Sequence, residues 1–391
     1  MDNIQNKFNF ISAVLVFFFL CLLLSESVFA EDSTFSVIDQ VVVQNHRPHA
    51  RSISKLFVFG DSYVDTGNNK IFTGESWKFP YGMTFPGIPT GRYSDGLVFT
   101  DFLASFMGMK SPMPYKQWTG LFKWRVRNGM NFAHGGTGVF NTWIKEPNMT
   151  TQINTFKQYI ADGVYNKCDL DKSMAIVVLS GNDYTQYVLD GGTDEGFRAF
   201  IVKVLNQLEV NLREIGKIGV KKVVMLTLQP LGCLPNKAIS VSYEKCDEPL
   251  NNETIFHNTL LQQIVQKLNS KTTDSPFHVL DLYSAFLSVI NKSAGERGSA
   301  KFGNPLLKPC CIPASAEVLC GSVDGNGVKQ YTLCENPTDN IFWDPVHPTQ
   351  AGWRAISSAL KPSIDKLMLS DQLNIHPQRP SFSASVATFK I

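Results

Sequence analysis

The sequence lacks a run rich in lysine and arginine, and neither sign of charge dominates it. Its 36 basic residues stand against 34 acidic ones, which leaves a formal net charge of +2 on 391 residues. Proteins that track nucleic-acid phosphates carry a basic stripe, so this balance argues against a nucleic-acid partner. Internal repeats and a central linker are also missing, which favours a single globular domain.

Long apolar runs are absent beyond the first thirty residues, so no later segment is expected to cross a membrane. Near the N-terminus, Lys7 precedes an apolar run at residues 11–24, and the Val-Phe-Ala of residues 28–30 suits cleavage. Because a bilayer span needs about 20 apolar residues, we expect a cleaved signal peptide at 1–30; the alternative is an uncleaved anchor. The protein is therefore expected to be secreted and extracellular, with no membrane span after signal removal.

Cys-x-x-Cys pairs and Cys/His pairs of zinc-finger spacing are absent, which argues against a structural zinc site. Cys21 is removed with the signal, and in an oxidising compartment most of the other cysteines should form disulfides. Cys233 and Cys246 bracket a Pro-containing loop that one bridge could close, and isolated Cys168 is the candidate for the unpaired thiol. Connectivity stays open for the four that crowd together: Cys310, Cys311, Cys320 and Cys334.

Three Asn-x-Ser/Thr triplets, at Asn148, Asn252 and Asn291, fit the same compartment. Each can accept an N-linked glycan only where it is exposed, and such triplets also occur by chance. We expect glycosylation at these three asparagines.

Five apolar runs without polar alternation indicate strands buried on both faces, at residues 56–59, 129–133, 174–179, 223–228 and 277–282. Amphipathic or capped helical patterns accompany them, at residues 95–107, 197–215, 253–268 and 349–367. This alternation predicts an α/β fold with a mainly parallel five-stranded sheet covered on both faces. We place the domain at 55–368, between a loosely ordered leader at 31–54 and a mobile tail at 369–391.

Polar turns follow three of these strands: Gly60-Asp61-Ser62, His134-Gly135-Gly136 and Gly181-Asn182-Asp183. Because the carboxyl ends of parallel strands share one edge of the sheet, these turns should converge there. A serine on such a turn is either a nucleophile or, more commonly, a helix cap. We expect Asp61 and Asp65 to bind backbone N–H groups of their own turn, since they flank Ser62 too closely to act as its base.

A fourth polar turn, Asp344-x-x-His347, precedes the last helix and supplies a base. Asp344 can hold the Nδ1 of His347, so that Nε2 faces Ser62 and takes its proton. Taken alone, such a pair is more often a helix cap beside a surface histidine. Together the turns contain the groups for acyl transfer, with Asn182 and the N–H groups of Ser62 and Gly136 as oxyanion donors.

Other features of the sequence give weaker support to other sites and folds. His134 lies beside the predicted oxyanion glycines, but we find no acidic partner near it in sequence and expect it to line the pocket at best. An α/β-hydrolase would set its serine in a Gly-x-Ser-x-Gly elbow, and no such elbow occurs. The stretch Asp324-Gly325-Asn326-Gly327 lacks the other ligands of a calcium loop, so we expect a hairpin turn.

These blocks resemble the GDSL esterase/lipase family within the SGNH hydrolase superfamily. The similar motifs are Phe59-Gly60-Asp61-Ser62, Asn131-Phe132-Ala133 with Gly135-Gly136, Gly181-Asn182-Asp183 and Asp344-x-x-His347. Further stretches, such as Gly91-Arg92-Tyr93-Ser94-Asp95-Gly96 and Cys310-Cys311, look like the plant secreted branch. The resemblance implies a flavodoxin-like three-layer α/β/α sandwich and no cofactor or metal. It also implies a Ser62 nucleophile, oxyanion donors at Gly136 and Asn182, and an Asp344–His347 pair. His134 departs from it, because many relatives carry serine there.

We therefore expect a secreted, disulfide-bonded glycoprotein that hydrolyses carboxylic esters through an acyl-Ser62 intermediate. The substrate would be a small-molecule, lipid or acylated-sugar ester, whose acyl chain and alcohol no linear pattern specifies. Two alternatives stay open: an acyltransferase that discharges the same acyl-enzyme to another hydroxyl, and a non-catalytic secreted binding glycoprotein.

Overall fold

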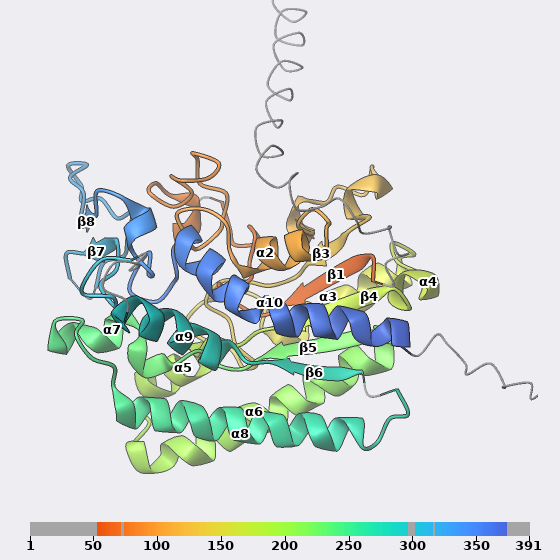
Figure 1. Ribbon diagram of the computed structural model, residues 1–391. Coiled ribbons are helices and arrows are strands. Elements are labelled where there is room, and N and C mark those ends of the chain that lie inside the picture. The colour runs from red at the N-terminus through yellow and green to blue at the C-terminus, as the bar shows by residue number, and fades with distance from the viewer. Residues whose placement is uncertain (1–52, 72–73, 275, 296–301, 316, 374–391) are drawn as a thin grey trace, which may run out of the picture. The chain divides into compact units, whose positions relative to one another are not determined.

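The computed structural model describes residues 53–71, 74–274, 276–295, 302–315 and 317–373, so the predicted signal peptide and nearly all of the predicted leader lie outside the described residues. A six-stranded sheet forms the centre, with strand order β2-β3-β1-β4-β5-β6 and every neighbouring pair parallel (Figure 1). The strands are β1 (Lys55–Phe59), β2 (Met113–Pro114), β3 (Gly129–Asn131), β4 (Ser173–Val177), β5 (Lys222–Leu226) and β6 (Phe277–Leu280).

The five predicted strands are confirmed, and β2 is a sixth that the sequence analysis missed. It has only two residues, and Pro114 suits the edge of a sheet because proline cannot donate a ladder hydrogen bond. Without β2, the order β3-β1-β4-β5-β6 is the flavodoxin-like order 2-1-3-4-5, as the resemblance implied. Its direction of winding reverses beside β1, where such folds place their ligands.

Helices cover both faces of the sheet, which explains why β4 and β5 are buried along their whole length. One set packs together as α3 (Met149–Ala161), α5 (Asn182–Leu189), α6 (Asp194–Ile218) and α8 (Glu248–Asn269); the other contains α2 (Phe99–Phe106), α9 (Leu282–Gly295) and α10 (Gln350–Leu373). Figure 1 shows α6 and α8 side by side. The described part of the chain also contains two short helices, α4 (Lys167–Leu170) and α7 (Pro235–Ala238). The fold is thus the predicted three-layer α/β/α sandwich.

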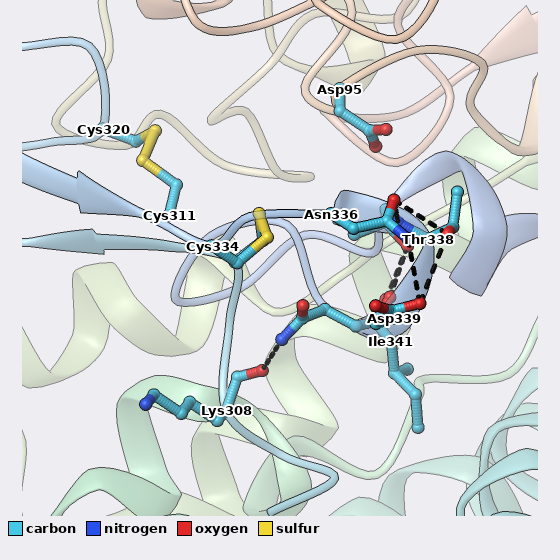
Figure 2. The surroundings of a disulfide bond; sticks show 12 residues. Asp95, Lys308, Cys311, Cys320, Cys334, Asn336, Thr338, Asp339 and Ile341 are labelled. Carbon is cyan, nitrogen blue, oxygen red and sulfur yellow. Dashed lines mark hydrogen bonds between the residues drawn. A yellow bond between two sulfur atoms is a disulfide. The ribbon is translucent and has the colours of Figure 1, made fainter. Parts of the chain in front are cut away.

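Three disulfides close loops of this domain: Cys233–Cys246, Cys310–Cys334 and Cys311–Cys320. The first is the predicted bridge, and exposed Cys168 is unpaired, as expected. The other two enclose a small antiparallel sheet of β7 (Cys311–Pro313) and β8 (Tyr331–Leu333). Figure 2 shows Cys311–Cys320 and, beside it, Cys334 at the start of the segment that leads to Ile341.

Helix α10 continues to Leu373, so the first residues of the predicted mobile tail are helical, while 374–391 lie outside the described residues. Within the described ranges, no helix is both long enough and apolar enough to cross a membrane.

Candidate active site

Ser62 lies on the turn that follows β1, at the carboxyl end of the strand. The strand order reverses beside β1. The Ser62 side chain is nearly covered, with 3% of the residue exposed. Its Oγ lies 2.8 Å from Nε2 of His347, although 285 positions separate the two residues. The fold therefore joins the first and last polar turns predicted from the sequence.

Asp344 holds the other nitrogen of this imidazole. Nδ1 of His347 lies 2.7 Å from Oδ2 and 2.9 Å from Oδ1 of Asp344. Burial raises the pKa of Asp344, but the His347 ring and backbone donors outweigh it and hold that pKa below its usual range. An ionised carboxylate can only accept, so Nδ1 carries the proton and Nε2 is left to accept from the Ser62 hydroxyl.

Two tyrosines fasten this chain of hydrogen bonds, and sequence reasoning identified neither. The Tyr81 hydroxyl donates to Asp344 Oδ2 over 2.9 Å, from the long loop after β1. The Tyr63 hydroxyl donates to the Val346 carbonyl over 2.8 Å, which ties the serine turn to the histidine turn. Since both partners are more than 200 positions away, no local pattern could have indicated these contacts.

The predicted oxyanion donors stand on neighbouring turns. Gly136 follows β3 with φ +81°, a conformation that disfavours side chains, and a Cβ there would lie 2.5 Å from Ile144 Cγ1. Asn182 is the first residue of α5, and its Nδ2 donates to the Thr137 carbonyl over 3.0 Å, which leaves a second N–H on the amide. Within the described part of the chain, no group accepts from the backbone N–H of Ser62 or Gly136.

His134 is placed differently from the prediction. Its side chain is fully buried, so it does not line an open pocket, and it does have an acidic partner: Nδ1 lies 3.3 Å from Oε2 of Glu146. Nε2 lies 3.2 Å from the Tyr115 hydroxyl, and Lys116 reaches the same Glu146 oxygen at 3.0 Å. Although burial raises the pKa of Glu146, His134 and Lys116 lower it to about 2. The partner was missed because it lies in a loop that has no periodic pattern.

The carboxylates beside the serine bind backbone N–H groups, as predicted. Asp61 accepts from Tyr63 over 3.2 Å, and Asp65 accepts from Gly67 and Asn68 over 2.8 Å each. Burial raises the pKa of Asp61 to about 6, and hydrogen bonds from Ser180 and Tyr63, together with His347, offset this only in part.

The remaining predicted sites are easily located. Asn252 and Asn291 are exposed, on α8 and α9. Asn148 is half-buried and caps α3, accepting from Thr151. The stretch around Asp324 is the predicted hairpin turn, closed by an antiparallel bridge between Val323 and Lys329. Among the residues that the structure describes, no His, Cys, Asp and Glu cluster could hold a metal ion.

A family model described as GDSL-like Lipase/Acylhydrolase matches residues 56–360. The chain belongs to this family. A GDSL esterase/lipase of Arabidopsis thaliana is 51% identical over 324 residues, covering 82% of this chain and 89% of that protein. A second one from the same plant is 44% identical over 343 residues, covering 87% and 96%. Acetylajmalan esterase 2 of Rauvolfia serpentina is 32% identical over 340 residues, covering 80% and 90%.

The predicted resemblance to plant GDSL esterases and lipases is confirmed by these matches, and so is the predicted class of activity. This GDSL protein is a serine esterase/lipase that hydrolyses carboxylic esters.

Proposed function

We propose that the hydrolysis runs through an acyl enzyme on Ser62. The observation that carries the proposal is the 2.8 Å contact between Ser62 Oγ and His347 Nε2. His347 takes the hydroxyl proton as Oγ forms its bond to the ester carbonyl carbon, and it returns that proton to the departing alcohol as the acyl–oxygen bond breaks. Water, activated by the same histidine, then cleaves the acyl-Ser62 bond.

The carbonyl oxygen gains negative charge in both steps, and three donors are available for it. They are the N–H groups of Ser62 and Gly136 and the second amide N–H of Asn182. Loss of one donor of this kind typically costs about 2.7–4 kcal/mol of transition-state stabilisation. Asp344 keeps the His347 tautomer fixed and stabilises the imidazolium that forms when the proton is transferred.

The donors have apolar neighbours, which we assign to the acyl group of the substrate. A Cβ at Gly136 would meet Ile144 at 2.5 Å, and a Cβ at Gly181 would meet Leu231 Cδ2 at 3.1 Å. An acyl chain whose carbonyl oxygen binds the donors therefore lies against Ile144 or Leu231. The substrate class proposed is a small-molecule, lipid or acylated-sugar ester with an apolar acyl group.

We also propose that the protein acts outside the cell after removal of residues 1–30. Three disulfides support this assignment, because they persist in oxidising compartments. The exposed sequons at Asn252 and Asn291 are consistent with the secretory route. N-terminal sequencing of protein recovered from the medium of expressing cells should begin at Glu31; a start at Met1, or retention inside the cell, would contradict the proposal.

Activity on acetyl, butyryl and palmitoyl p-nitrophenyl esters and on acetylated sugars tests the mechanism. Ser62→Ala and His347→Ala should each lower kcat by at least about 10⁴-fold. Ser358→Ala, at an exposed position of α10, is the matched control and should keep full activity. Hydrolysis that survives Ser62→Ala would contradict the acyl enzyme. A correctly folded wild type inert on every ester would favour a binding protein, and an added alcohol that diverts the product to a new ester would favour a transferase.

A further inference from the structure

Three buried carboxylates that the proposed proton transfers do not use lie at the turns after β1 and β4. Asp61 and Asp65 are fully buried and Asp183 is 4% exposed. None of the three has a salt-bridge partner among the residues that the structure describes. Burying a charge costs free energy unless the charge is hydrogen-bonded. These three carboxylates must therefore be stabilised by hydrogen bonds.

Each carboxylate reaches out of its own turn to a backbone N–H of another. Asp61, after β1, accepts from the Ser180 N–H after β4 over 2.6 Å. Asp183, after β4, accepts from the N–H groups of Val139 and Phe140 after β3, over 3.0 Å each. Two pairs of turns are thereby linked.

The third pair is linked by Asp65, which follows β1 and accepts from the Gly135 N–H after β3 over 3.0 Å. Every pair of the three turns is now joined by one carboxylate, so the links form a closed ring, which we call the aspartate ring: Asp61, Asp65 and Asp183. Because a ring constrains each turn from two sides, one turn cannot shift without breaking a charge-assisted hydrogen bond.

Every proposed oxyanion donor is the chain neighbour of a residue in these links. Ser62 follows Asp61, Gly136 follows Gly135, and Asn182 precedes Asp183. The ring also requires a close approach at Gly138, where a Cβ would lie 2.3 Å from Asp183 Oδ2. A side chain at position 138 would push this carboxylate off its two donors.

We infer that Asp61, Asp65 and Asp183 are positioning residues that fix the spacing of the three oxyanion donors. The inference rests on the proposed function, because it concerns how the donors of that mechanism are held. Stabilisation of a developing oxyanion depends on donors that are already in place, so a small shift of one turn weakens it.

The ring should be sensitive to acid. Burial raises the pKa of Asp183 to about 6, as it does that of Asp61. Among the described residues, His347 and Tyr63 interact electrostatically with Asp61, and Tyr184 interacts with Asp183. Protonation turns one acceptor oxygen into a hydroxyl, which then meets an N–H donor. One of the hydrogen bonds that the carboxylate accepts is lost, and the ring is weakened.

Two substitutions test the ring. Asp183→Asn replaces the accepting carboxylate by an amide, and Gly138→Ala displaces that carboxylate from its N–H donors. Both should lower kcat on p-nitrophenyl acetate about 10- to 100-fold, while KM changes less than about threefold. Asp101→Asn is the matched control, because Asp101 is buried and accepts from Arg92 and the Val98 N–H, outside the ring. It should lose stability and keep kcat within about twofold.

A double-mutant cycle with Asn182→Ala separates positioning from general stability. If Asp183 acts through the donors, Asp183→Asn should reduce kcat less in the Asn182→Ala background than in the wild type. The inference would be overturned if the effects of Asp183→Asn and Asn182→Ala on the activation free energy were fully additive. It would also be overturned if the Asp183→Asn and Gly138→Ala variants folded correctly and kept the kcat of the wild type. Ser62→Ala in the same assay distinguishes the two claims: if it stays active, the proposed function fails, and if it is inactive while Asp183→Asn is fully active, only the ring fails.

Discussion

Tyr81 donates its hydroxyl to Asp344 Oδ2 over 2.9 Å, from a loop 263 positions earlier in the chain. Both groups are buried, so removing the hydroxyl leaves a carboxylate lone pair without its partner. We predict that Tyr81→Phe lowers the free energy of unfolding by about 1–3 kcal/mol and lowers kcat several-fold. Urea unfolding and steady-state kinetics measure both.

The control for Tyr81 is Tyr159→Phe, on α3, whose hydroxyl makes a long 3.4 Å contact with the Tyr115 carbonyl. This variant should behave like the wild type in both measurements. Equal kcat and stability in Tyr81→Phe and the wild type would show that the Tyr81 contact does not support Asp344.

The titration of Asp183 predicts opposite pH trends for stability and activity. Its folded pKa of about 6 lies above the ordinary 3.8, so between these values the folded protein binds the proton more tightly than the unfolded chain. The stability of the wild type relative to Asp183→Asn should therefore rise as the pH falls from 7 to 4, by an amount on the order of 3 kcal/mol. Over the same range kcat of the wild type falls.

Comparison with the variant is needed because His257 titrates in the opposite sense. Burial lowers the pKa of His257 to about 3, so its contribution to stability is lost as the pH falls. This contribution is common to both proteins and cancels in the difference. A difference in unfolding free energy that does not change with pH would rule out the raised pKa of Asp183.

The Cys310–Cys334 disulfide should support activity as well as stability. The Cys310 N–H donates to the Phe342 carbonyl over 3.0 Å, just before Trp343 and Asp344. Replacing both cysteines by serine should lower stability by about 2–5 kcal/mol and lower kcat. Cys168→Ser, at the exposed free thiol, is the control and should change neither quantity.

Glycans should occur at the exposed sequons when the protein is made in a secretory host. Asn252 and Asn291 lie on exposed positions of α8 and α9, so a glycan there meets no packed side chain. The Asn148 side chain is half-buried and occupied as a helix cap, so its occupancy should be lower. Enzymatic deglycosylation followed by peptide mass spectrometry identifies each site, and recovery of all three asparagines unmodified would count against the secretory route.

The parts of the fold that depend on local pattern could be predicted, and those that depend on tertiary contact could not. Strands such as β4 are continuous apolar runs. Their order was implied only by the resemblance to the GDSL family. Strand β2 has two residues, too few for a period to be read, and is stabilised by pairing with β3. The beginning of a helix depends on its cap: α8 begins at Glu248, five residues before the predicted 253, because Asp247 caps it by accepting from Leu250.

The same distinction applies to the site. Ser62 and His347 could be paired because a serine at the ligand-binding edge of the sheet needs a base, and the Asp344-x-x-His347 turn supplies one. Tyr81 could not be predicted, since its loop has no period and its partner is far away in sequence. The burial of His134 and its contact with Glu146 could not be predicted either. In the sequence, His134 is simply a polar residue beside two glycines.

The most direct test of the account is covalent labelling of the nucleophile. A fluorophosphonate forms a bond from phosphorus to an activated serine oxygen and expels fluoride, so it reports which hydroxyl His347 activates. The account predicts one adduct per chain, located by peptide mass spectrometry on Ser62, with complete loss of esterase activity and no adduct in Ser62→Ala or His347→Ala. Stoichiometric inactivation with the adduct on any other residue, or undiminished hydrolysis by protein fully labelled at Ser62, would contradict it.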